Sequence, residues 1–183
     1  MVTSGTQFFG YGSLVNLATH DYRNPRKATV QGWRRQWVYA ANRNASFLSV
    51  TPDPQTSIQG MIADVTDLGW KALDAREAAY NRHALQSRDH AGVHIYQANP
   101  DYVDPTAQHK PILLSYIDCV IQGFLTHFGT DGVTGFFEST SGWERPIKDD
   151  RAEPIYPRAQ RLSPDQTELV DHHLDRLAVT VLR

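Results

Sequence analysis

The chain has 183 residues, of which 40% are hydrophobic and 21% are charged. This composition excludes a disordered chain, a collagen and a coiled coil. Cys119 is the only cysteine, so an internal disulfide and a thiolate metal cluster are excluded as well. The apolar runs are far shorter than the ~20 residues that span a bilayer. We therefore expect one domain over residues 1–183, no membrane partner and, since the first residues do not resemble a secretory signal, a cytoplasmic location.

The net charge of −2 is unevenly distributed along the chain. Residues 1–52 carry six bases and one acid, a net charge of +5, whereas residues 53–183 have a net charge of −7. A basic first third indicates an anionic partner, either a small molecule or a macromolecule, unless these charges are simply scattered over a solvated surface.

The first half of the chain has the pattern of a sheet. Short apolar and aromatic segments, bounded by glycine or proline, predict strands over residues 7–11, 28–42, 47–50, 58–65 and 93–97. Gly32 divides the second segment into two strands or bends it, and the proline cluster at 52–54 predicts a turn.

Two helices are predicted in the middle of the chain. The first covers residues 68–82 and has Thr66 or Asp67 as its cap. The second covers residues 111–128, where apolar residues follow the three-to-four spacing of one buried face.

A third helix begins at the capping box Ser163–Gln166 and runs to about residue 178. Before it lies a long connection, 139–161, in which Trp143 and Arg151 either fold over a binding site or merely cross the surface. Strands first and helices later indicate an α+β fold, with 139–183 a loop plus a C-terminal helix packed on the rest.

The segment Gly10-Tyr11-Gly12-Ser13-Leu14 follows the first predicted strand. It lacks the third glycine of a dinucleotide fingerprint, and the chain has no glycine–lysine phosphate loop. A strand that ends in such a turn can still point successive backbone amides at an anion. The alternative is a tight turn that needs glycine only for its backbone conformation.

A second candidate lies on the helix predicted over 68–82. Leu73, Glu77 and Tyr80 are spaced i, i+4 and i+7, which places a carboxylate on an apolar face. Burial would raise its pKa toward the range useful for proton transfer. The alternative is an edge glutamate that pairs with Arg76 or Arg82 on the surface.

Together, these two segments resemble the gamma-glutamylcyclotransferase-like superfamily. The resemblance rests on Phe9-Gly10-Tyr11-Gly12-Ser13-Leu14 followed by Leu73-Asp74-x-Arg76-Glu77-x-x-Tyr80-x-Arg82. Three intervening segments resemble the family's second strand, the strand before the glutamate and the helix behind the site: 31–35, 58–61 and 115–118. The resemblance covers about residues 7–128.

This resemblance implies a small mixed β-barrel with flanking helices and a cavity at the glycine turn. Members of the family release an amine or peptide from a γ-glutamyl compound and form 5-oxoproline. The substrate's own α-amine attacks its side-chain carbonyl, so the enzyme has to orient the substrate and move a proton. No metal, cofactor or covalent nucleophile is required.

The resemblance also implies roles for individual residues. Glu77 is the catalytic acid/base. Substrate binding falls to Tyr11, Gly12, Ser13, Leu14 and Tyr80. The backbone amides of residues 12–14 hold the α-carboxylate, and the two tyrosines wall the pocket or donate hydrogen bonds. The expected partner is a small anionic γ-glutamyl substrate. Glutathione, γ-glutamyl amino acids, γ-glutamyl amines and antibiotic conjugates all stay open, as does the oligomeric state.

Two alternatives belong to other functional classes. One is a binding module on this fold that has lost turnover. The other is a nucleic-acid or protein-interaction domain that uses residues 20–43, where Arg34 and Arg35 lie between two tryptophans. Strand alternation, however, puts Trp33, Arg35 and Trp37 on one face, which favours a place in the core and an absence of nucleic-acid binding.

Overall fold

A computed structural model describes residues 6–107 and 109–182 of the chain. Its strands are β1 (Gln7–Gly10), β2 (Arg23–Tyr39), β3 (Ser46–Asp64), β4 (Tyr80–Ala84), β5 (Val93–Ala98), β6 (Ile112–Leu113), β7 (Thr140–Ser141), β8 (Ile147–Lys148) and β9 (Val181–Leu182). Its α-helices are α1 (Asp67–Arg76), α2 (Leu114–Glu138) and α3 (Pro164–Arg176). Its short 3-10 turns are η1 (Ser13–Val15), η2 (Leu17–Thr19), η3 (Arg88–His90) and η4 (Pro100–Tyr102).

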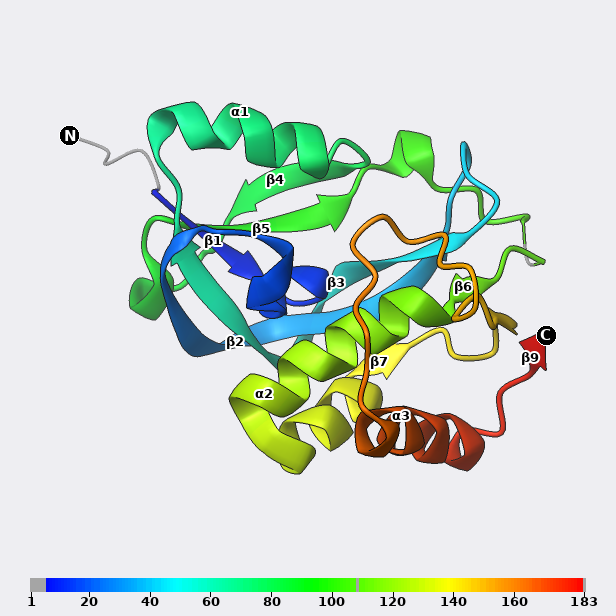
Figure 1. Cartoon of the computed structure of the whole chain (residues 1–183). Coiled ribbons are helices and arrows are strands. Elements are labelled where there is room, and N and C mark those ends of the chain that lie inside the picture. The colour runs from blue at the N-terminus through cyan, green and yellow to red at the C-terminus, as the bar shows by residue number, and fades with distance from the viewer. Residues whose placement is uncertain (1–5, 108, 183) are drawn as a thin grey trace.

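Six strands form a mixed sheet in the order β4-β5-β1-β3-β2-β7, and β6, β8 and β9 form a second, small one (Figure 1). β1 is antiparallel to β3 and parallel to β5, and β2 and β3 form a long antiparallel hairpin. The predicted α+β fold with flanking helices is confirmed, and the strands of the implied small mixed β-barrel are paired as a mixed sheet. None of the described helices is long and apolar enough to cross a membrane.

The short strand β1 is buried on both faces. Phe8 packs in a cluster with Leu73 of α1, while the next residue, Phe9, packs in the larger cluster that contains Phe124 of α2. Successive side chains of a strand point to opposite faces, so these two phenylalanines bind one helix to each side of the sheet. α1 and α2 accordingly lie on opposite sides of β1 in Figure 1. The turn after β1 emerges between them.

The long hairpin of β2 and β3 differs from the sequence prediction in one place. The proline cluster predicts a turn at 52–54, but β3 continues through these residues as one strand, and residues 53–56 bulge out of the ladder opposite Gly32. Gly32 has a φ of 89°, a conformation that favours glycine. Pairing resumes on both sides of the bulge, so β2 is one bent strand and the hairpin stays continuous.

The first helix is shorter than its sequence predicts. Thr66 caps α1 as expected by accepting a hydrogen bond from the Gly69 amide at 3.1 Å, but the helix ends at Arg76 and residues 80–84 form β4. β4 pairs antiparallel with β5. The hydrogen bonds of this pairing outweigh the weak helical preference of a few residues. The prediction that Glu77 and Tyr80 share one helical face is therefore wrong.

The second helix begins later than predicted and runs further. Residues 112–113 form β6, so α2 starts at Leu114, and it continues to Glu138. The helix is interrupted at Gly129, whose φ of 69° is left-handed. The third helix, α3, begins at the capping box predicted for Ser163, in which Gln166 completes the reciprocal hydrogen bonds.

The connection between α2 and α3 is tied to both helices. Buried Asp150 accepts hydrogen bonds from the Ser115 amide at 2.8 Å and from its hydroxyl at 2.6 Å. Arg151 makes two hydrogen bonds to Asp118 of α2, at 2.7 and 2.8 Å, and one to Asp171 of α3 at 2.7 Å. Charge-assisted bonds of this kind fix the course of the connection over α2.

Arg35 of β2 is only 1% exposed and joins three separate segments. Its Nε donates to the Tyr11 carbonyl at 2.8 Å, its Nη1 donates to the Ser139 hydroxyl at 2.7 Å, and its Nη2 donates to the Gln59 carbonyl. The guanidinium therefore connects the turn after β1, the middle of β3 and the end of α2.

The surroundings of Arg35 are apolar. The rings of Phe124 and Phe136 lie 5.0 and 5.1 Å from the guanidinium carbon, and burial lowers the pKa of Arg35 to about 9. Arg34, one residue earlier, faces outward and pairs with Asp53 at 2.9 Å. The core placement that strand alternation favours for the aromatic residues of this face is confirmed for Trp37, and Arg35 is buried beside it on the same face.

We expect Arg35→Met to lower the free energy of unfolding by at least about 3 kcal/mol, because it leaves two carbonyls and a hydroxyl without their donor. Arg34→Met is the matched control, and its loss of an exposed ion pair should cost less than about 1 kcal/mol. Urea unfolding of both variants measures the difference. Equal losses in the two variants would contradict this account of Arg35.

Candidate active site

The pocket of interest lies at the turn that follows β1. The Val15 amide donates to the Gly12 carbonyl at 2.9 Å, and the Asn16 amide donates to the Ser13 carbonyl at 3.1 Å. Val15 thus has the first amide that finds an acceptor inside this turn. The amides of Gly12, Ser13 and Leu14, which come before it, are not used by the turn. Such leading amides are available to an anion. The turn can therefore hold a carboxylate, as the sequence predicts.

The turn is held from two sides. The Tyr11 hydroxyl donates to the Tyr96 carbonyl of β5 at 2.7 Å. On the other side lies Tyr116 of α2, and a Cβ built on Gly12 would lie 2.7 Å from its hydroxyl oxygen. The Ser13 backbone is close enough to hydrogen bond to the same hydroxyl. Gly12 is thus required for the close approach of α2.

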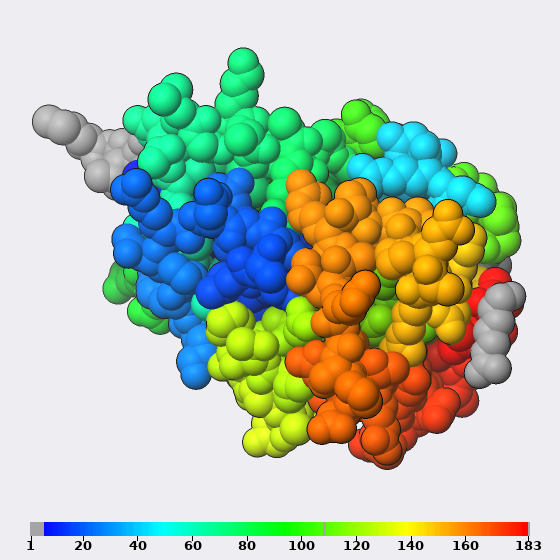
Figure 2. Space-filling model, in the orientation of Figure 1, coloured from blue at the N-terminus to red at the C-terminus, as the bar shows by residue number. Residues whose placement is uncertain are grey.

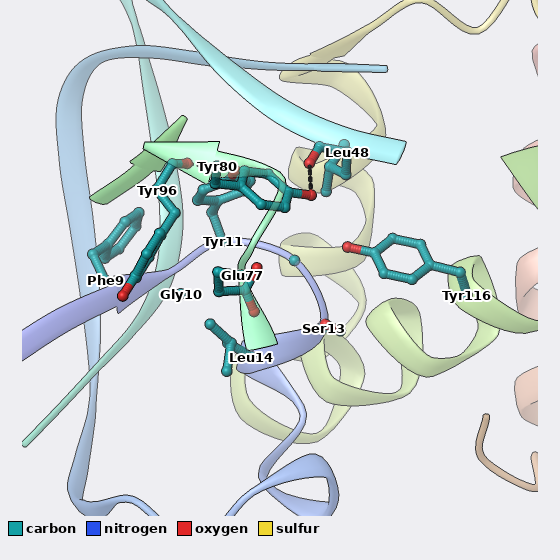
Figure 3. A pocket seen from close by; sticks show the side chains of 11 residues that line it. Phe9, Gly10, Tyr11, Ser13, Leu14, Leu48, Glu77, Tyr80, Tyr96 and Tyr116 are labelled. Carbon is teal, nitrogen blue, oxygen red and sulfur yellow. Dashed lines mark hydrogen bonds between the residues drawn. The ribbon is translucent and has the colours of Figure 1, made fainter. Parts of the chain in front are cut away.

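Glu77 supplies a carboxylate to this pocket (Figure 3). It is the C-cap of α1, and its amide still donates to the Leu73 carbonyl at 2.9 Å. Burial raises the pKa of Glu77 above its usual value, against the opposing charges of Arg76, Arg158 and Arg43. Arg76 is the nearest of these, with its Nε 3.2 Å from Glu77 Oε1. A carboxyl group with a raised pKa is suited to proton transfer near neutral pH.

Four tyrosines also line the pocket: Tyr11, Tyr80, Tyr96 and Tyr116. Burial raises the pKa of each one, so all four hydroxyls are neutral at physiological pH. The Tyr80 hydroxyl donates to the Leu48 carbonyl at 2.7 Å, which anchors β4 to β3 (Figure 3). These groups can therefore donate or accept hydrogen bonds, but they carry no charge.

The pocket is narrow. Its cavity volume is about 30 Å³, which is little more than the space for one or two water molecules. A ligand with several heavy atoms therefore has to displace lining side chains. Tyr116 reaches in from α2, and its hydroxyl lies beside the turn (Figure 3). It is the group that a carboxylate on these amides would displace.

A wider hollow of about 650 Å³ lies between the start of β2 and α1. Arg76 lies between it and the narrow pocket, because this guanidinium contacts Glu77 and also donates to the Thr19 carbonyl at 3.0 Å. Arg158, from the connection before α3, also lines the hollow. Figure 2 shows residues near 10–20, in blue, and the orange connection meeting on this face.

The six residues that the sequence assigns to the site all line the narrow pocket: Tyr11, Gly12, Ser13, Leu14, Glu77 and Tyr80. Their individual roles stay predictions. Both readings of Glu77 are partly correct, because it is buried and it also pairs with Arg76. The sequence did not indicate Leu48, Tyr96 or the inward position of Tyr116, since strand pairing and helix packing place them there.

The connection at 139–161 has two different roles. Trp143 is buried against Trp37 and Phe137, with ring centroids 5.4 and 5.1 Å away, so it belongs to the core. The Tyr156 ring lies 4.9 Å from the Tyr116 ring. The later part of the connection therefore reaches the pocket.

Within the described ranges, no three His, Cys, Asp or Glu side chains are grouped so that they could hold a metal ion. Glu77 is the single carboxylate among the residues that line the narrow pocket. The chemistry of the pocket is therefore that of one carboxyl group, backbone amides and neutral hydroxyls.

No family model and no curated protein matches the chain, but solved structures do. YkqA from Bacillus subtilis superposes with a TM-score of 0.56 at 13% identity, over 97% of this chain and 56% of YkqA. An uncharacterized protein from Homo sapiens has a TM-score of 0.56 at 11% identity, over 91% of this chain and 98% of that one. A structure described as a gamma-glutamyl cyclotransferase has a TM-score of 0.55 at 10% identity, with the same coverage of 91% and 98%.

The chain has the gamma-glutamyl cyclotransferase fold. The resemblance seen in the two sequence motifs is thereby confirmed at the level of the fold. Identities of 10–13% show the fold alone, and the chain spans just over half of the length of YkqA. Any activity for this example of the cyclotransferase fold has to be argued from the pocket itself.

The raised pKa of Glu77 predicts how stability depends on pH. The folded protein binds this proton more tightly than the unfolded chain, so stability falls as pH rises from the ordinary glutamate pKa of about 4.3 through the raised value. Glu77→Gln removes that loss. We expect the variant to exceed the wild type in stability by more at about pH 8 than at about pH 4.

Urea unfolding at both pH values measures this effect. The control is Glu168→Gln on the exposed side of α3, which removes a carboxyl group that does not line the pocket. A stability difference for Glu77→Gln that is the same at both pH values would contradict a raised pKa.

Proposed function

We propose that the protein cyclises the γ-glutamyl group of a small substrate, forming 5-oxoproline and releasing an amine or a peptide. The observation that carries this proposal is the position of Glu77. A single, largely buried carboxyl group lines the same pocket as a turn whose leading amides can hold a carboxylate, in a chain with the gamma-glutamyl cyclotransferase fold. Acid/base catalysis and anion binding are thus available in one pocket.

In this proposal the backbone amides of residues 12–14 bind the α-carboxylate of the substrate and displace the Tyr116 hydroxyl. Binding at this point places the α-nitrogen and the γ-carbonyl carbon of the same molecule in the narrow part of the pocket. Holding the two reacting groups in a ring-forming geometry removes the entropy cost of bringing them together. The neutral tyrosine hydroxyls supply hydrogen bonds to the polar groups of the substrate.

Glu77 then moves the protons. The α-nitrogen forms a bond to the γ-carbonyl carbon, and the bond from that carbon to the leaving nitrogen breaks. The α-nitrogen loses two protons as it changes from an ammonium to a lactam nitrogen, and the leaving group takes up two as it departs as an ammonium. Glu77 relays these protons between the two nitrogens, which requires a carboxyl group that both accepts and donates near neutral pH.

The nucleic-acid alternative depends on an exposed strand of arginines and tryptophans. Arg35 and Trp37 are buried at 1% and 2% exposure, and Arg34 pairs with Asp53. These side chains do not form the stacking and charged surface that single-stranded nucleic acid requires. A binding module without turnover has no observation in its favour, because the carboxyl group needed for turnover is in place.

We expect Glu77→Gln to lower kcat/KM for 5-oxoproline formation by about 10²- to 10⁴-fold, the usual contribution of a general acid/base. Glu168→Gln on the exposed side of α3 is the matched control and should retain full activity. Chromatographic detection of 5-oxoproline from a set of γ-glutamyl compounds measures both. Full activity in Glu77→Gln would contradict the proposed role of Glu77. If the wild-type protein formed no 5-oxoproline from any of the compounds, the proposed function itself would be wrong.

A further inference from the structure

The leaving group of the proposed reaction must lie beside Glu77, because its nitrogen takes up protons from that carboxyl group. Arg76 forms the boundary there, with its guanidinium between Glu77 and the wide hollow. With a cavity volume of about 30 Å³, the narrow pocket has no room for the leaving group beside a γ-glutamyl group. The leaving group therefore extends past Arg76 toward the hollow of about 650 Å³.

Arg158 lines this hollow from the connection before α3. Arg158 lies in a β-turn over residues 156–159, in which the Ala159 amide donates to the Tyr156 carbonyl at 3.1 Å. Pro157 occupies the second position of this turn, where proline is favoured. Tyr156 in turn rests on the Tyr116 ring. The backbone at Arg158 is therefore held at a fixed place relative to the pocket before any ligand binds.

Arg158 is exposed, and it takes part in none of the ion pairs found in residues 6–107 and 109–182. Its charge acts on Glu77, and so does that of Arg43, which lies in the loop between β2 and β3. Arg43 is likewise exposed and absent from those ion pairs. The charges of two exposed guanidinium groups from distant segments thus act on the carboxyl group where the leaving nitrogen is protonated.

In the part of the chain that the structure describes, neither of the two carboxylates that line the hollow forms an ion pair with Arg158. Asp64 is held by the Gln7 and Asn24 side-chain amides, each at 2.6 Å. Asp21, the other carboxylate that lines the hollow, is exposed, and its charge acts on His20. An arginine that is fixed in place and not neutralised is well suited to pair with a carboxylate of a ligand.

We propose that Arg158, assisted by Arg43, binds a carboxylate on the leaving group, so that the preferred substrates are γ-glutamyl amino acids or peptides and not γ-glutamyl amines. This inference rests on the proposed function and narrows its substrate class. A γ-glutamyl amine lacks the second carboxylate and would leave both arginines without a partner. The chemistry that recognises the substrate thus has two parts, one for each of its carboxylates.

Matched substrates test this directly. γ-Glutamylalanine and γ-glutamylalaninamide have nearly the same shape, but only the first has a carboxylate on the leaving group. Glutathione and its glycine amide form a second such pair for peptide leaving groups. We expect the wild-type protein to prefer the carboxylate of each pair by about tenfold or more in kcat/KM, as is typical of a charged hydrogen bond.

Arg158→Gln should bring this preference toward one, and Arg158→Lys should restore part of it because the charge returns. The control is Arg176→Gln at the exposed end of α3, which should keep the wild-type preference. Arg43→Gln combined with Arg158→Gln should remove what preference is left. Thermal unfolding of each variant shows whether the fold is retained.

The outcomes separate the two levels of the proposal. 5-Oxoproline formed equally well from both members of each pair, or a preference that survives in the double variant, would overturn the role of Arg158 and leave the proposed function intact. No 5-oxoproline from either pair would overturn the proposed function and this inference together.

Discussion

The candidate site depends on one buried cation. Arg35 forms no ion pair with a carboxylate in residues 6–107 and 109–182, and it instead donates to the Tyr11 carbonyl, the Gln59 carbonyl and the Ser139 hydroxyl. A charge in such an apolar place is tolerated only because its donors are used, and because two phenyl rings face the guanidinium. The same bonds fix where β1 ends. The turn at Gly12 and the helix α2 behind it meet at a distance that Arg35 sets.

Charge was a poor guide to the site when counted along the chain. The net +5 of residues 1–52 indicated an anionic partner for that part of the chain. In the folded protein Arg35 is buried in the core and Arg34 pairs with Asp53. Arg76 and Arg158, two of the three arginines that act on Glu77, come from the acidic remainder of the chain. Folding, and not the net charge of a segment, decides which charges act on a buried group.

The fold does not by itself establish the chemistry. Solved structures with TM-scores of 0.55–0.56 share only 10–13% of their residues with this chain. What links fold to activity is a small constellation: one carboxyl group of raised pKa, three leading amides and neutral hydroxyls in a narrow pocket. In the proposed reaction, selectivity falls to segments outside it, since the connection that carries Tyr156 and Arg158 contacts Tyr116 and lines the wide hollow.

Local patterns in the sequence were enough to predict the α+β class, β1 with its glycine turn, and the caps of the helices α1 and α3. Each of these features depends on the alternation of side chains or on contacts between residues that lie a few positions apart in the chain. The sequence also named six of the eleven residues that line the narrow pocket. It did not determine that Glu77 ends a helix and Tyr80 begins a strand, since pairing between β4 and β5 overrides local preference. Only the tertiary structure decided the places of Arg76, Tyr116 and Arg158 beside Glu77, because long-range packing brings those segments together.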